Sequence, residues 1–163
     1  MVTKEYRFVF CLLPFVYLLL LSGCAGTVKN TSTVPAGEVV TSPADGKSLI
    51  VFMRPSFYGS GFQSSVFEVK EENVFLAGIV AAKKKVSYEL EPGEHLFMVV
   101  GESADFMSAN LEPNKTYYAL VTPRVGMWKT RFSLKPIHST ELSSDKFEEW
   151  LQDCEWVKKS PAS

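Results

Sequence analysis

The chain has 163 residues, which is enough for one domain of ordinary size with a single hydrophobic core. Its 17 Lys and Arg residues nearly balance 18 Asp and Glu residues, so the formal charge is −1. A nucleic-acid partner requires a concentrated positive surface, and this balance argues against one. Neither of the two histidines has a second His, Cys or carboxylate at metal-ligand spacing, so we expect no metal and no other cofactor.

The first residues have the layout of a secretory signal. Basic side chains precede an uncharged apolar run, 8–21, which is shorter than the roughly 20 residues that a transmembrane helix needs. Small residues follow the run. We therefore expect 1–23 to be a signal peptide that is cleaved between Gly23 and Cys24.

The leader ends in Leu21-Ser22-Gly23-Cys24, which resembles the lipobox of bacterial lipoproteins. The resemblance implies that the Cys24 thiol is acylated, so that palmitate-type chains attach the mature protein to a membrane. In such lipoproteins an Asp after the cysteine favours the inner membrane. Ala25 therefore implies the periplasmic side of the outer membrane, or the cell membrane in a host with only one.

Residues 24–47 are rich in Thr, Ser, Gly, Pro and Ala and contain no aromatic residue. This composition predicts a lipidated, flexible tether that spans roughly 25 Å. Because Cys11 leaves with the leader and Cys24 is acylated, Cys154 has no partner for an internal disulfide. We expect a buried thiol there, with an intermolecular bridge as the alternative.

From Ser48 onward, short β-rich runs are separated by turn residues at intervals of about ten, as is typical of an all-β sandwich or barrel. The runs are 49–54, 64–69, 74–79, 86–90, 96–100, 106–111, 116–122 and 130–134. Tight turns follow from Pro92-Gly93 and Pro113-Asn114, in which Gly93 and Asn114 can adopt positive φ. We predict an antiparallel β-sandwich of about 7–8 strands over 48–137.

The remainder, 138–163, is predicted to be a connector followed by an amphipathic α-helix. Ser143 and Ser144 can cap the helix, and Lys158-Lys159 would complete its last turn. Apolar residues recur at helical spacing at Phe147, Trp150, Leu151, Cys154 and Val157. The helix would pack on the sandwich, bury Cys154 and leave Trp156 on its exposed side.

Three segments resemble a bacterial lipoprotein family. They are Ile50-Val51-Phe52-Met53-Arg54-Pro55, Tyr88-Glu89-Leu90-Glu91-Pro92-Gly93-Glu94-His95-Leu96 and Lys115-Thr116-Tyr117-Tyr118. The family has no assigned function, and its domain is similar to PEGA-type and transthyretin-like sandwiches. The resemblance implies architecture and location but no chemistry. That family usually has an Asp-Gly turn between its second and third strands, where this chain has Glu72-Asn73.

Alternating strand directions predict that the connections gather at two ends of the sandwich. One end collects acidic turns, and the other collects loops with basic and aromatic side chains. The candidate binding face at that second end consists of Phe57, Tyr58, Phe62, Lys83, Lys84, Lys85, Arg124 and Trp128. Aromatic residues and Arg dominate binding hot spots, so we expect this face to bind an envelope protein or glycan. In the alternative, the lysines form a solvated turn and the aromatic rings fold back onto the core.

No catalytic signature is present, so we expect a non-enzymatic, lipid-anchored binding module. The first rival is an enzyme that acts on envelope glycan or lipid through Glu102, Asp105 and His95, although strand counting places His95 at the opposite end. The second rival is a spacer without a discrete ligand. His95 is expected to be structural and to contact turn carbonyls, and Tyr117 or Tyr118 to bond a nearby backbone group.

Overall fold

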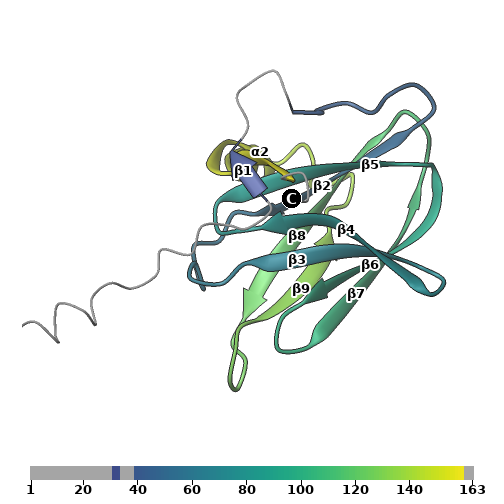
Figure 1. The fold of residues 1–163 in the computed structure, drawn as a ribbon. Helices are drawn as coiled ribbons and strands as arrows, with labels where there is room; N and C mark the ends of the chain where they lie inside the picture. Colours follow the sequence, from purple (N-terminus) through teal and green to yellow (C-terminus); the bar gives the residue numbers. More distant parts are fainter. Residues whose placement is uncertain (1–30, 34–38, 160–163) are drawn as a thin grey trace, which may run out of the picture.

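The computed structural model describes residues 31–33 and 39–159, which form two packed β-sheets and one short helix (Figure 1). The helix, α2, spans Asp145–Asp153. The strands are β1 Thr31–Thr33, β2 Ser48–Arg54, β3 Ser64–Lys70, β4 Asn73–Val80, β5 Lys84–Leu90, β6 Gly93–Val100, β7 Ala104–Leu111, β8 Thr116–Arg124, β9 Arg131–Pro136 and β10 Glu155–Lys159. The predicted β-sandwich with a C-terminal helix is confirmed.

The larger sheet has the strand order β1-β10-β5-β2-β8-β9, and the smaller sheet has the order β4-β3-β6-β7. The smaller sheet is antiparallel, as predicted. The larger sheet is mixed, because β2 pairs parallel with β8 and β10 pairs parallel with β5. The predicted antiparallel arrangement thus holds for most strand pairs, and these two parallel pairs in the larger sheet are the exceptions. Strands β2 and β8 both begin at the same end of the sandwich and therefore run in the same direction. Because they are neighbours in the larger sheet, they pair in parallel.

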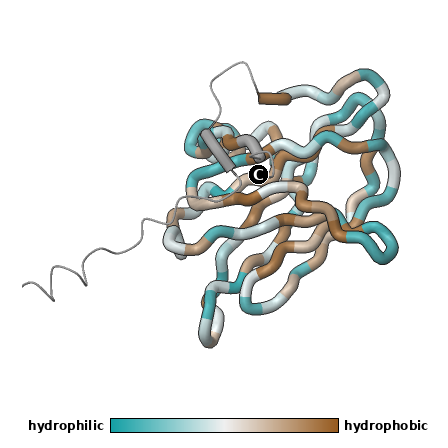
Figure 2. Tube along the Cα trace, in the orientation of Figure 1, coloured by the Kyte–Doolittle hydropathy of each residue, from teal (hydrophilic) through white to brown (hydrophobic). Residues whose placement is uncertain are grey.

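The main core lies between the two sheets, where Phe52 of β2 meets Phe97 of β6 edge to face with ring centroids 5.2 Å apart. A second cluster lies on the other side of β2, where α2 covers Leu49, Val51 and Met53. Because both faces of β2 are covered, all seven of its residues are buried. Figure 2 shows that apolar stretches follow the strands, whereas hydrophilic stretches are common at the connections.

Helix α2 begins where the sequence predicts but ends earlier. Ser144 caps it by accepting a hydrogen bond from the Phe147 amide at 3.2 Å. The backbone turns extended at Cys154 and continues as β10 along the edge of β5. The prediction that the helix reaches Val157 and Lys158-Lys159 is therefore wrong. Cys154 is buried as expected, but as the residue after the helix.

The predicted flexible tether, 24–47, includes residues that belong to the folded domain. Thr31–Thr33 pairs with β10 as β1. The amide of Ala44 donates to Glu89 Oε2 at 2.9 Å, and that of Gly46 donates to Asn114 Oδ1 at 2.8 Å. The ordered domain thus starts before Ser48. The predicted signal peptide and Cys24 lie outside the described residues, and within those residues no helix is long and apolar enough to span a membrane.

The turn predictions are confirmed at Gly93 and Asn114, whose φ angles are 130° and 60°. Tyr117 also fulfils its prediction, since its hydroxyl accepts a hydrogen bond from the Glu112 amide at 2.9 Å. The β3–β4 hairpin turns through Glu71 and Glu72, and Glu71 adopts a φ of 49°. Two residues thus make this turn without a glycine.

Candidate binding surface

The connections gather at two ends of the sandwich. In the β2–β5 register Arg54 is level with Lys84, and in the β8–β9 register Arg124 is level with Arg131. One end of the sandwich therefore carries the four connections 55–63, 81–83, 101–103 and 125–130. We call this end the loop end. Its β8–β9 hairpin projects at the bottom of Figure 1. The opposite end carries residues 71–72, 91–92 and 112–115, and we call it the acidic end.

The first loop, 55–63, is fixed by the side chain of Arg54, the last residue of β2. Arg54 is 0% exposed, and its guanidinium donates to the carbonyl oxygens of Tyr58, Gly59 and Phe62 at 2.7, 2.8 and 2.7 Å. The ring of Phe132 lies 5.1 Å from its Cζ. A buried charge therefore holds the loop from inside, at three points of its backbone.

The β8–β9 loop, 125–130, is fixed by Glu102 of the neighbouring β6–β7 loop. The Glu102 Oε2 atom accepts from the amides of Trp128 at 2.8 Å and Lys129 at 2.9 Å, while Oε1 pairs with Arg131 at 2.8 Å. The backbone amides of Lys129 and Trp128, followed by Arg131, lower the pKa of Glu102 to about 2. The carboxylate is thus ionised at physiological pH and joins two loops.

The two anchored loops carry six large apolar side chains that face solvent. Their exposed fractions are 69% for Phe57, 56% for Tyr58, 50% for Phe62, 79% for Val125, 79% for Met127 and 86% for Trp128. The aromatic residues predicted for the binding face are therefore exposed, and they do not fold back onto the core. Met127 and Val125 join them because they lie on the same hairpin loop as Trp128.

The predicted lysines are less available than the aromatic residues. Lys83 pairs with Asp153 at 2.7 Å, and Lys84 pairs with Glu155. Lys85 is only 6% exposed, donates to the carbonyl oxygen of Leu151 and lies 4.8 Å from the centroid of the Trp156 ring. Its place on an exposed binding face is therefore wrong, because α2 and β10 cover it. The same contact leaves Trp156 half-buried, contrary to the expectation that it is exposed.

Arg124 remains at the loop end, exposed, with Nε donating to Ser133 Oγ at 2.9 Å. The large exposed side chains of the loop end are thus mainly apolar, and they are accompanied by Arg124, by Lys129 and by Lys83, which is paired with Asp153.

The three groups of the enzyme hypothesis do not converge. Glu102 is engaged by the β8–β9 loop, and Asp105 Oδ2 accepts from the Leu134 amide at 2.9 Å. His95 lies near the other end of β6, opposite Ala109, whereas Asp105 is opposite Val99. His95 instead contacts the Glu91 carbonyl at 2.8 Å and stacks on Phe97. This is the structural role that the sequence predicts.

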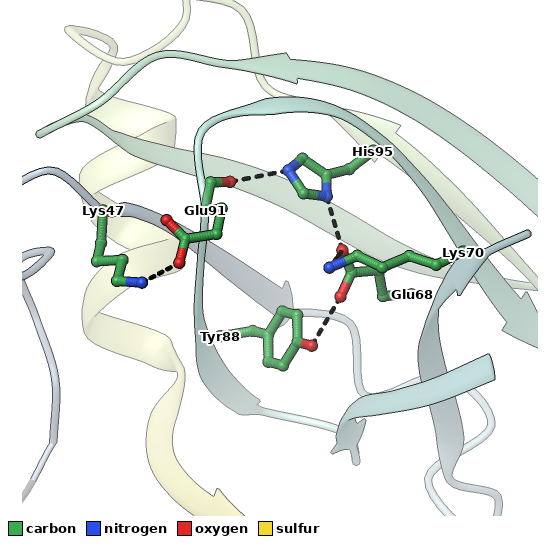
Figure 3. A network of polar contacts seen from close by, with 6 residues as sticks. All are labelled: Lys47, Glu68, Lys70, Tyr88, Glu91 and His95. Carbon is green, nitrogen blue, oxygen red and sulfur yellow. Dashed lines mark hydrogen bonds and ion pairs between the residues drawn. The ribbon is translucent and has the colours of Figure 1, made fainter. Parts of the chain in front are cut away.

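His95 belongs to a buried network at the acidic end that sequence reasoning missed (Figure 3). Its centre is Glu68, 1% exposed, whose carboxylate is reached by Tyr88 Oη at 2.8 Å, His95 Nδ1 at 2.6 Å and Lys70 Nζ at 3.0 Å. Burial alone would raise the pKa of Glu68, but hydrogen bonds from Lys70, Tyr88 and His95 outweigh it and lower that pKa. The sequence signal for this network was the position of Glu68, which lies two residues after Val66 in β3 and therefore faces inward.

The His95 ring links the two parts of this network. The Glu91 carbonyl can only accept, so His95 Nε2 carries a proton. His95 Nδ1 lies 2.6 Å from Glu68 Oε1, so the ring bridges the buried carboxylate and the Glu91 carbonyl. Both ring nitrogens are thus engaged within the protein, and the network is a structural clamp on the turn that contains Glu91.

Within the described residues no cluster of three His, Cys, Asp or Glu side chains could hold a metal ion. Comparison with protein-family models finds no match, and comparison with curated proteins finds no significant match.

Proposed function

We propose that this protein is a non-enzymatic, lipid-anchored binding module of the bacterial cell envelope. Acyl chains on Cys24 hold it at the periplasmic side of the outer membrane, and its loop end binds another envelope protein. The observation that carries the proposal is the pair of anchored loops whose six large apolar side chains face solvent.

Exposed apolar side chains are common singly, but this group is concentrated on two neighbouring loops that are held from within. Arg54 fixes one loop and Glu102 fixes the other. Loops that are ordered before binding lose less conformational freedom when a partner docks. Trp128, Tyr58 and Phe57 are then ready-made anchors for pockets on a partner.

A protein partner fits the chemistry of the loop end better than a glycan does. Sugar hydroxyls need directed hydrogen-bonding groups, and the carboxylates of Glu102 and Asp105 are engaged within the domain. The exposed side chains are instead Trp, Met, Val and Phe, together with Arg124. Aromatic residues, Met and Arg are enriched in protein interfaces.

The chain path leaves the loop end free. Strand β5 runs from the loop end to the acidic end, β10 is parallel to it, and β1 is antiparallel to β10. The chain therefore enters β1 from the side of the acidic end. In a single copy of the chain, a membrane anchor upstream of Thr31 would then leave Trp128 and its neighbours accessible to a partner away from the attachment point.

The test is photo-crosslinking in intact cells with a photoreactive aromatic residue in place of Trp128. We expect capture of one dominant envelope protein, and we expect Tyr58→Ala in the same chain to reduce that capture. A photoreactive residue at Lys135, exposed on β9 but outside the loops, is the matched control and should not capture it. Mass spectrometry of the mature N-terminus should find Cys24 acylated.

Stability separates this proposal from its rivals. Replacing both Tyr58 and Trp128 by Ala should leave the thermal midpoint nearly unchanged, whereas Phe52→Ala should cost about 3–5 kcal/mol because that ring is fully buried. If the double variant unfolds as readily as Phe52→Ala, the two rings belong to the core, and the hypothesis of a spacer without a discrete ligand is supported instead. Capture of glycan alone would contradict a protein partner, and an unmodified Cys24 would contradict the anchor.

A further inference from the structure

The outer face of the smaller sheet is apolar, although one face of an antiparallel sheet is commonly polar when it meets solvent. Its inner side is defined by Val66, Phe97 and Met107, which belong to the main core. Residues next to these in sequence point outward and form cross-strand rows. One row joins Phe67, Met98 and Phe106, a second joins Val74, Val69, Leu96 and Ser108, and a third joins Ser65, Val100 and Ala104.

These three rows contain no charged residue. Phe106 is 55% exposed, Val74 53% and Val100 40%. With strands about 4.8 Å apart and rows about 7 Å apart, the apolar face measures roughly 400 Å² in projection. This lies within the range of about 300–600 Å² for the largest apolar patch of a monomer, and such patches are often functional. The larger sheet differs, since α2 covers the apolar residues on its outer side.

The apolar face continues into an open groove of about 900 Å³ toward the acidic end. Its lining includes Val69, Leu96 and Ser108 of the apolar face, together with the charged residues Lys70, Glu71 and Glu94. The face therefore offers both projecting side chains, such as Phe106, and a hollow that can receive side chains of similar size.

We propose that this face binds a second copy of the chain, sheet against sheet, in an antiparallel arrangement. A twofold axis in the interface and perpendicular to the strands reverses the strand direction of one copy. The exposed glutamates at positions 71, 72 and 94 then approach the loop end of the other copy, where Lys129 is exposed and Arg131 is paired with Glu102. An arrangement with the axis along the strands would place acidic end on acidic end.

The size pattern is also self-complementary. The row of large side chains lies beside a row that contains Ser65 and Ala104, so large groups of one copy can face small groups of the other. An anionic lipid surface is a poorer occupant, because Glu71 and Glu94 in the lining would face negative headgroups while Lys70 is paired with Glu68. A core of about 400 Å² is half of the standard 800 Å² per partner, so we expect a weak dimer with a Kd on the order of micromolar.

The experiment is sedimentation velocity of the full chain as the cell makes it, solubilised in detergent at a micelle excess, over a concentration series. The wild type should form a dimer with a Kd on the order of micromolar. Phe106→Asp and Ser108→Asp should each weaken dimerisation at least tenfold with an unchanged thermal midpoint. Ser108→Asp adds a charge without removing an apolar group, which guards against misfolding of the first variant.

Phe57→Asp is the matched control, since it removes a comparably exposed ring outside the three rows and should weaken the dimer much less than Ser108→Asp does. A wild-type chain that stays monomeric at several hundred micromolar overturns the proposal, whether or not it binds anionic vesicles. A dimer that Phe57→Asp abolishes and Ser108→Asp does not would assign self-association to the loop end instead. Because partner capture at Trp128 is a separate assay, either proposal can fail without the other.

Discussion

The strongest prediction concerns Arg54, because this one buried side chain determines the shape of the first loop of the candidate surface. In Arg54→Met the aliphatic stem still packs, but the guanidinium and its hydrogen bonds are lost. Three carbonyl oxygens, those of Tyr58, Gly59 and Phe62, then lose their donors. The Phe132 ring also loses the cation above it.

The magnitude follows from two opposing contributions. Hydrogen bonds to a charged group contribute about 1.5–3 kcal/mol each, and three of them are lost. Removal of the buried charge also relieves a desolvation cost of several kcal/mol, and the loop can move to hydrate its carbonyls. We therefore expect the free energy of unfolding to fall by about 2–4 kcal/mol.

Two measurements check this expectation. Urea unfolding gives the change in stability, and amide hydrogen exchange shows whether residues 56–63 open before the rest of the domain. Lys135→Met is the matched control, because Lys135 is exposed on β9 and its loss should change stability by less than about 0.5 kcal/mol. If Arg54→Met is as stable as this control, or its loop amides exchange as slowly as in the wild type, Arg54 does not hold the loop.

Two further predictions rest on the buried titratable groups. Because the pKa of Glu68 is lower in the folded state, its stabilisation is present above the ordinary value of 4.5 and disappears as pH falls through the folded value. Glu68→Gln should therefore flatten the dependence of unfolding free energy on pH below about 4.5, and an unchanged slope in urea titrations would contradict this. Burial raises the pKa of Cys154 to about 11, so maleimide should label it slowly at pH 7 and rapidly in denaturant. Rapid labelling of the native protein, or a dimer that reduction removes, would indicate an accessible thiol.

Much of the sandwich could be predicted because its local signals agree with its tertiary contacts. Each of the eight β-rich runs corresponds to a strand, and Gly93 and Asn114 adopt the positive φ that their turns need. Tyr117 and His95 were also predictable, since a side chain next to a tight turn has backbone groups within reach.

The C-terminal segment was harder to predict for a physical reason. Cys154 and Val157 are three residues apart, which suits a helix, but the same two positions are also buried when the chain leaves α2 and follows β5. The free edge of β5 decides between these possibilities, and a local pattern contains no information about that edge. The short polar strand β1 was hard to predict for the same reason, because it pairs with the edge of β10.

The burial of Lys85 shows a similar limit. In sequence it is the third of three consecutive lysines, which suggests a solvated turn. In the structure it is the second residue of β5, and its ammonium reaches a carbonyl of α2 and the ring of Trp156. Alternation along a strand sends neighbouring side chains to opposite faces, so Lys84 and Lys85 have different surroundings.

The buried charges of this domain are better explained by the shape of its connections than by its stability. Desolvation of a buried ion offsets much of the stabilisation that its hydrogen bonds provide, so stability alone does not explain why charges occupy positions 54 and 68. Both side chains instead reach groups that determine loop geometry. Arg54 collects carbonyls of the first loop, and Glu68 acts through His95 on the Glu91 carbonyl. An apolar residue at either position could fill the space, but it could not specify where a loop backbone lies. For the loop end this matters directly, because the direction in which Tyr58 and its neighbours point follows from the backbone that Arg54 holds.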